Sequence, residues 1–202
     1  GPSGGGKTTL AKIMLGLLAP TDGQVFVGGI DLQKLGVEAY RRLVGTVMQD
    51  DPLFAGSIAD NVSFFDPSPC QEAIERCTRL AAVHDDIAAM PMGYHTLIGD
   101  MGAALSGGQR QRILLARALY KQPRILFVGE ATSALDVQRE RQVNEAIRGL
   151  NLTRILIAHR PETIASAGRV IVLQGGKVAQ DLRRAFEASR EAGASAAGAR
   201  RE

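Results

Sequence analysis

The first eight residues could bind the phosphates of a nucleotide, because Gly1 to Thr8 match the pattern G-x-x-x-x-G-K-S/T. In this pattern glycines let backbone N–H groups surround an anion, and a lysine, here Lys7, reaches the β- and γ-phosphates. The Thr8 hydroxyl can ligate Mg²⁺. A glycine-rich tail is the alternative interpretation. The residues expected to contact nucleotide are Ser3, Gly4, Gly5, Gly6, Lys7, Thr8 and Thr9.

A second candidate anion site lies at 105–109, where Leu-Ser-Gly-Gly-Gln precedes a predicted helix. Backbone amides at a helix start, the helix dipole and the Ser106 hydroxyl all favour a bound anion. Two such helix starts in one chain suggest a composite nucleotide site. The residues expected to take part are Ser106, Gly107, Gly108 and Gln109.

Glu130 lies just beyond the apolar run 125–128, which is typical of a buried parallel strand. Ligands of open α/β sheets bind beyond strand ends, so Glu130 is a candidate general base for a water molecule. An isolated surface carboxylate is the alternative. His84 and His95 belong to no motif and are interpreted as structural residues.

The elements that must position these residues alternate between helical and strand patterns. Further helices are predicted at 58–62, 71–83, 107–120 and 137–147, buried strands at 44–48, 125–128 and 154–158, and hairpins at 24–29 and 170–178. The first helix starts near Lys7 and is expected to bury Leu10, Ile13, Met14, Leu17 and Leu18. The cluster 139–141, Arg-Glu-Arg, is interpreted as a solvated helix face. The fold class is therefore α/β, with a mostly parallel sheet and an inserted helical lobe.

Length and composition fit this class and exclude others. The 202 residues are 45% hydrophobic, enough for one sizeable core. The net charge of +3 comes with no basic stripe, so no nucleic acid partner is expected. Cys70 and Cys77 form neither a disulfide framework nor a metal-ligand set, which favours reduced thiols. No apolar run approaches the ~20 residues of a membrane span, and no signal peptide is present, so we expect this segment on the cytosolic side.

The predicted elements divide the chain into a core, a lobe and a tail. The core comprises 1–52 and 121–180, the helical lobe 53–120, and the tail 181–202, which is expected to be disordered or a frayed helix. The P-loop is the turn that leaves a strand, and no residue precedes Gly1. We therefore expect the natural protein to be longer at its N-terminus.

With these motifs in this order, residues 1–180 closely resemble the nucleotide-binding domain of an ATP-binding cassette (ABC) transporter, a P-loop NTPase fold. The sequence 105–109, extended by Arg-Gln-Arg, corresponds to the family signature. By this resemblance Gln49 is the Q-loop glutamine, 133–136 the D-loop and His159 the switch histidine. The catalytic residues implied are Glu130, His159, Lys7 and Gln49, the cofactors are ATP and Mg²⁺, and the metal ligands are Thr8 and Gln49.

The resemblance implies a head-to-tail dimer of two ABC domains. Each ATP would lie between Lys7 and Thr8 of one subunit and the signature residues Ser106, Gly107 and Gly108 of the other. Gln49 would touch Mg²⁺ and sense a transmembrane domain.

Two stretches are similar to exporters, namely 51–62 after the Q-loop and 96–102 before the signature. The resemblance is greatest to the colicin V and bacteriocin exporters, which carry a cysteine-peptidase domain, a membrane domain and this cassette. It implies an ATPase that powers export, of a peptide or bacteriocin-like cargo, at the cytoplasmic face of the inner membrane.

Two departures from the family pattern leave alternatives open. The adenine-stacking aromatic of the family lies upstream of the P-loop, where this chain has no residues, and the aspartate that supports Mg²⁺ falls at Gly129. A catalytically impaired ATP-binding fragment is therefore one alternative. The other is a soluble ABC ATPase acting on DNA or ribosomes, which would call for basic patches or long insertions.

Overall fold

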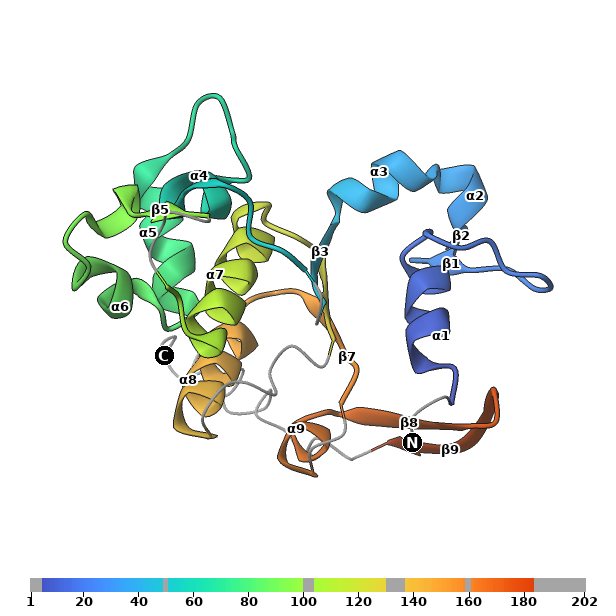
Figure 1. Cartoon of the computed structure of the whole chain (residues 1–202). Helices are drawn as coiled ribbons and strands as arrows, with labels where there is room; N and C mark the ends of the chain where they lie inside the picture. Colours follow the sequence, from blue (N-terminus) through green and yellow to red (C-terminus); the bar gives the residue numbers. More distant parts are fainter. Residues whose placement is uncertain (1–4, 49–50, 100–103, 130–136, 159–160, 184–202) are drawn as a thin grey trace, which may run out of the picture. The chain divides into compact units, whose positions relative to one another are not determined.

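The computed structural model describes residues 5–48, 51–99, 104–129, 137–158 and 161–183 (Figure 1). Contacts divide the chain into two compact units. The larger unit spans 11–157, and the smaller one combines 1–10 with 158–202. The boundaries expected for the core, the lobe and the tail stay predictions.

A three-stranded parallel sheet forms the centre of the larger unit, in the order β3-β6-β7. The strands are β3 (Val44–Val47), β6 (Ile125–Val128) and β7 (Thr153–Leu156). Along β6, Leu126 and Val128 pack into one hydrophobic cluster and Phe127 into another, because alternate residues of a strand point to opposite faces. The predicted mixed α/β fold with parallel strands is thus confirmed.

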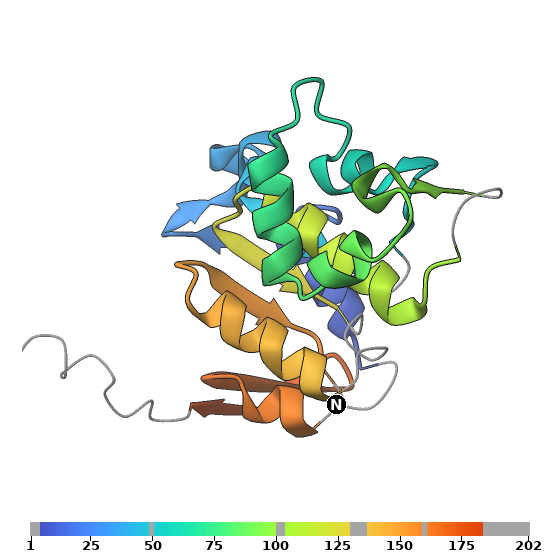
Figure 2. The ribbon, with the colours of Figure 1, turned by 90° about the vertical axis from the view of Figure 1, so that its left-hand side faces the viewer.

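The segment between β3 and β6 is mainly helical, as the sequence predicts. Its longest helix, α7, contacts α4, α5 and β3, and α5 and α7 lie side by side in Figures 1 and 2. Eight residues of α7, from Arg112 to Leu119, are buried, which makes it the central helix of this segment. The elements are α4 (Ile58–Ser63), α5 (Gln71–Leu80), α6 (His84–Ala88), η1 (Gly93–His95), α7 (Gly107–Tyr120) and the two-stranded sheet of β4 (Gly56–Ser57) and β5 (Leu97–Ile98).

The other elements of the larger unit include the predicted hairpin and helix and two short helices. They are β1 (Phe26–Val27), β2 (Ile30–Asp31), α2 (Leu32–Leu35), α3 (Val37–Arg42) and α8 (Val137–Arg148). Tyr40 of α3 is buried with Leu15, Leu32 and Phe127 in the cluster on the second face of the sheet.

The buried face expected for the first helix was wrong for Leu10, Leu17 and Leu18, whereas Ile13 and Met14 are half-buried. Helix α1 spans Lys7–Met14, and Gly16 follows with φ +65°, so Leu17 and Leu18 lie beyond the helix and are 56% and 46% exposed. Leu10 is 40% exposed. Ala11 and Leu15 are buried instead, because residues four apart share one helix face.

The smaller unit contains α9 (Pro161–Ala165) and a hairpin of β8 (Arg169–Gln174) and β9 (Lys177–Arg183). The Arg169 guanidinium donates to both carboxylate oxygens of Asp181 across the hairpin, at 2.8 and 2.6 Å. Strand β9 therefore includes residues 181–183, which the sequence analysis assigned to the tail.

No helix among the described residues has the length and apolarity needed to cross a bilayer.

Candidate functional site

The start of α1 has the backbone that a phosphate-binding turn requires. Gly6 adopts φ +86°, a conformation that glycine reaches without strain, and its carbonyl accepts from the Leu10 N–H at 2.9 Å. Gly5 is buried, Lys7 is half-buried, and Thr8 and Thr9 are exposed in the first turn. Ser3 and Gly4 lie outside the described residues.

The start of α7 is closed by a capping box between Ser106 and Gln109. The Ser106 Oγ accepts from the Gln109 N–H at 3.1 Å, and the Gln109 Oε1 accepts from the Ser106 N–H at 3.0 Å. The spacing Ser-x-x-Gln is itself a sequence signature of this cap. Gln109, predicted to contact nucleotide, is thus seen to hold the local shape of the turn.

The cap leaves hydrogen-bond donors at the start of α7. Among the described residues, none accepts from the N–H groups of Gly107 and Gly108, the first two residues of the helix. Gly107 is exposed and Gly108 half-buried. The Ser106 hydroxyl accepts within the cap, so its own hydrogen can still be donated. Three donors at a helix N-terminus can bind an anionic group such as phosphate.

The end of β6 carries no carboxylate at residue 129. Gly129 is buried, and its N–H donates to the Val47 carbonyl at 2.8 Å. At the neighbouring end of β3, the Asp51 carboxylate accepts from the Met48 N–H at 2.7 Å. Asp51, which no motif singled out, is thus held close to this edge of the sheet.

Several predicted residues lie outside the described part of the chain: Gln49, Glu130, residues 133–136 and His159. Their roles stay predictions. Within the described ranges, no three His, Cys, Asp or Glu side chains gather as a metal site. Cys70 is exposed, Cys77 is buried, and both are free thiols.

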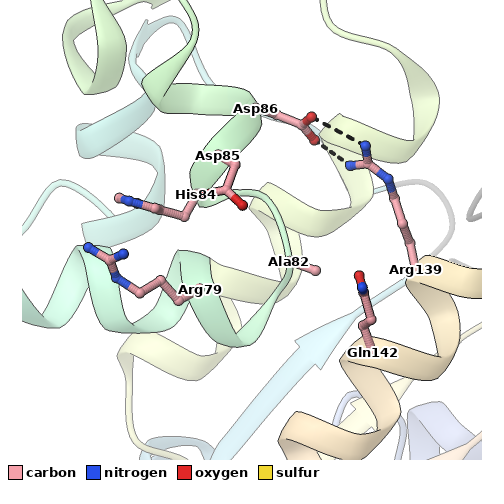
Figure 3. A pocket seen from close by; sticks show the side chains of 7 residues that line it. All are labelled: Arg79, Ala82, His84, Asp85, Asp86, Arg139 and Gln142. Atoms are coloured by element: carbon pink, nitrogen blue, oxygen red, sulfur yellow. Dashed lines mark hydrogen bonds and ion pairs between the residues drawn. The ribbon is translucent and has the colours of Figure 1, made fainter.

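Arg139 departs from the interpretation of 139–141 as a solvated face, because its side chain, 39% exposed, is held in an ion pair. Its guanidinium donates to the Asp86 carboxylate, with Nη1 to Oδ2 at 2.6 Å (Figure 3). Arg112 of α7 donates to the same carboxylate. Burial opposes the ionisation of Asp86, but the hydrogen bonds and charges of both arginines outweigh it and lower its pKa. His84 was rightly interpreted as structural, since its Nδ1 hydrogen-bonds the Tyr94 hydroxyl at 2.7 Å.

A second buried arginine fixes the segment that resembles exporters. Arg117 of α7 donates through Nε to the Asn61 carbonyl at 2.8 Å and through Nη1 to the Pro52 carbonyl at 3.0 Å. Its guanidinium lies 4.9 Å from the centre of the Phe54 ring. Burial lowers the pKa of Arg117. Residues 52–61 are therefore attached to the same helix that begins with the signature.

Comparison with known proteins explains this combination of motifs. The family described as "ABC transporter" matches residues 1–133. The "Colicin V secretion/processing ATP-binding protein CvaB" of Escherichia coli is 52% identical over 171 residues, 85% of this chain and 24% of that protein. The "Alpha-hemolysin translocation ATP-binding protein HlyB", also of Escherichia coli, is 44% identical over 184 residues, 89% of this chain and 26% of that protein.

A solved structure is also similar. The "Structure of a bacterial Atm1-family ABC exporter with ATP bound" has a TM-score of 0.84 and 36% identity, covering 89% of this chain and 32% of that one. The chain spans about a quarter of the length of its curated relatives. These similarities confirm the resemblance to exporters, including those of colicin V. The chain belongs to the ABC transporter family.

Proposed function

We propose that this chain is the ATP-binding and ATP-hydrolysing component of an ABC exporter. The observation that carries the proposal is that both phosphate-binding sequences begin helices: Gly6 and Lys7 at α1, and Ser106 to Gly108 at α7. The relatives' names support an exporter, since they describe secretion or translocation of colicin V and alpha-hemolysin. A peptide or bacteriocin-like cargo follows from the likeness to the colicin V protein.

The start of α1 fits the triphosphate of ATP. The left-handed Gly6 allows successive N–H groups to turn toward an anion, and the Lys7 ammonium adds positive charge for the β- and γ-phosphates. The residues present match a Mg²⁺ site less completely than they match a triphosphate site. Thr8 offers a hydroxyl oxygen, but Gly129 supplies no carboxylate, so Thr8 and Gln49 would hold the ion together with water and phosphate oxygens.

Hydrolysis would use two copies of the chain arranged head to tail. The Ser106 hydroxyl and the Gly107 and Gly108 amides of one copy would bind the γ-phosphate of ATP held by the other. Glu130 would orient or deprotonate the attacking water, and His159 would stabilise the phosphate during attack. ATP would supply ADP as the leaving group, and Mg²⁺, when bound, would neutralise the negative charge of the phosphates.

Coupling to transport would pass through a transmembrane domain at the cytoplasmic face of the inner membrane. The fixing of residues 52–61 by Arg117, shortly after Gln49 in sequence, supports a well-held segment for such contact. ATP binding would close the dimer, and hydrolysis would reopen it.

Substitutions at Lys7 and Glu130 in the complete protein test the proposal. Lys7→Ala should weaken ATP binding at least about tenfold, because it removes charge from the ground-state phosphates. Glu130→Gln should keep the ATP dissociation constant within about twofold and lower kcat by about a hundredfold or more. Lys12→Ala, at an exposed lysine of the same helix, is the control. An equal loss of ATP affinity in the Lys7 and Glu130 variants would contradict these roles.

A further inference from the structure

Asp86 joins three helices of the larger unit through one carboxylate. It lies in α6 and accepts from Arg139 of α8, with Nη1 to Oδ2 at 2.6 Å and Nη2 to Oδ1 at 3.4 Å. Arg112 of α7 donates to the same Oδ2. In Figure 3 the Arg139 side chain extends from α8 directly toward Asp86. The three helices are thus connected by charge as well as by apolar packing.

The burial of this cluster distinguishes it from ordinary surface ion pairs. The side chains of Arg112, Asp86 and Arg139 are 5%, 22% and 39% exposed, whereas those of the pair Arg42 and Glu38 are 77% and 87% exposed. Exposed pairs contribute little, since water screens them. A guanidinium as buried as that of Arg112 needs its carboxylate partner. Asp86 is therefore fixed by Arg112 and offers a rigid acceptor to Arg139.

The positions of the two arginines along their helices give the cluster its significance. Arg112 lies in the second turn of α7, close behind Ser106 to Gly108. Arg139 lies in the first turn of α8, a helix that follows the predicted D-loop 133–136 directly in sequence. Asp86 therefore links the helix that begins with the signature turn to the helix that follows the predicted D-loop.

We propose that Asp86 is a positioning residue that, through Arg139, holds the signature turn at the start of α7 in the orientation needed for ATP hydrolysis. This inference rests on the proposed function, because it assumes that Ser106, Gly107 and Gly108 act on ATP. Donors that stabilise a transition state must be placed accurately, and a displacement of about 1 Å can lower a rate by about a hundredfold. A fixed contact between α7 and α8 restricts such displacement.

The decisive variant is Arg139→Gln in the complete protein, since it breaks the link to α8 and leaves the buried pair of Asp86 and Arg112 intact. We expect kcat for ATP to fall about tenfold, while the ATP dissociation constant changes less than about twofold, because Lys7 and Thr8 are untouched. Arg139→Lys keeps the charge and should recover part of kcat. The melting temperature should stay close to that of the unaltered protein.

Arg79→Gln is the matched control. Arg79 lines a pocket that Asp86 and Arg139 also line (Figure 3). Its ion pair, Nη2 to Glu75 Oε2 at 3.1 Å, stays within α5. This variant should hydrolyse ATP at the unaltered rate. Equal losses of kcat in the Arg79 and Arg139 variants would overturn the inference, since the pocket's charge rather than the link would then matter.

A double-mutant cycle with Ser106 tests whether Arg139 acts through the signature turn. Ser106→Ala removes a donor of that turn, so adding Arg139→Gln to it should cost less than about twofold further in kcat. Two full and independent losses would overturn the inference. Two results separate the two proposals. If the unaltered protein does not hydrolyse ATP, the proposed function fails. If the unaltered protein and the Arg139→Gln variant hydrolyse ATP at the same rate, only the positioning role fails.

Discussion

At the scale of single residues, Gly129 is the position where this chain departs most clearly from the family pattern. It follows β6 immediately, where a carboxylate of a P-loop ATPase helps to hold Mg²⁺. An added Cβ would lie 3.4 Å from the Cα and Sδ of Met48 and 3.5 Å from the Val47 carbonyl oxygen, which is ordinary van der Waals contact. The backbone therefore admits a larger residue here.

Gly129→Asp should lower the Mg²⁺ concentration needed for half-maximal ATP hydrolysis. If better positioning of the metal contributes ~3 kcal/mol to the transition state, kcat should rise by about a hundredfold. Steady-state hydrolysis against Mg²⁺ concentration measures both effects. Gly129→Ala is the control, because it adds the same Cβ without oxygen ligands. Identical curves for the Asp and Ala variants would mean that Gly129 does not limit the reaction.

At the scale of the elements, Arg117 attaches α7 to α4 and to the chain that precedes it. The guanidinium of Arg117 donates to Asn61 and to Pro52 from different nitrogens. A lysine has a single ammonium group, which cannot reach both acceptors at once. Arg117→Lys should therefore lower the free energy of unfolding by about 2 kcal/mol, since buried acceptors lose their donors. Urea titration measures this loss. Arg110→Lys, at an exposed position of the same helix, should change it by less than about 0.5 kcal/mol.

The sequence predicts the regular elements where local pattern suffices. Strand β6 was predicted at its observed bounds, Ile125–Val128, because these four consecutive apolar residues lie between Pro123 and Gly129. Helix α7 was likewise predicted from Gly107 to Tyr120. Strands β4 and β5 were missed, since each has two residues and Gly56 pairs with the distant Ile98. No local pattern encodes such a pair.

The candidate site shows the same division between local and distant information. Ser106 and Lys7 were placed at helix starts because glycine-rich phosphate motifs have a fixed spacing. The roles of Asp86 and Arg139 could not be predicted, because the two residues are far apart in sequence and the arginine lies in a polar helix segment typical of a solvated face. Burial of a charge depends on the tertiary fold, which spacing along one helix does not report.

At the scale of the whole molecule, acid pH should destabilise the fold, because it neutralises the carboxylates and leaves the positive charges unbalanced. The chain carries 21 Asp and Glu against 24 Lys and Arg. As carboxylates become protonated below about pH 4, the cations of the whole chain repel one another without compensation. Moderate salt should weaken that repulsion by screening.

Four described carboxylates have a lowered pKa, namely Asp60, Glu75, Asp86 and Asp181, and they set the direction of the acid response. In Asp60 the side-chain hydrogen bond from Ser57 lowers the pKa below its ordinary value of 3.8. In Asp86, burial raises the pKa, but the hydrogen bonds and charges of Arg139 and Arg112 lower it by more. The pKa of Asp86 therefore also lies below 3.8. A carboxyl group with a lower pKa in the folded state stabilises the fold above its unfolded pKa, and this contribution is lost as pH falls through the folded value.

We therefore expect the melting temperature to be nearly constant from pH 7 to pH 5 and to fall below about pH 4. Asp60→Asn removes one of these groups and should lower the melting temperature at pH 6, where the charged carboxylate accepts from Ser57. The difference between the unaltered protein and this variant should shrink toward pH 3, because protonated Asp60 no longer contributes. Asp85→Asn, at an exposed neighbour of Asp86, is the control. A difference for Asp60→Asn that is equally large at pH 3 and pH 6 would show that the cap stabilises the fold through its geometry rather than through its charge.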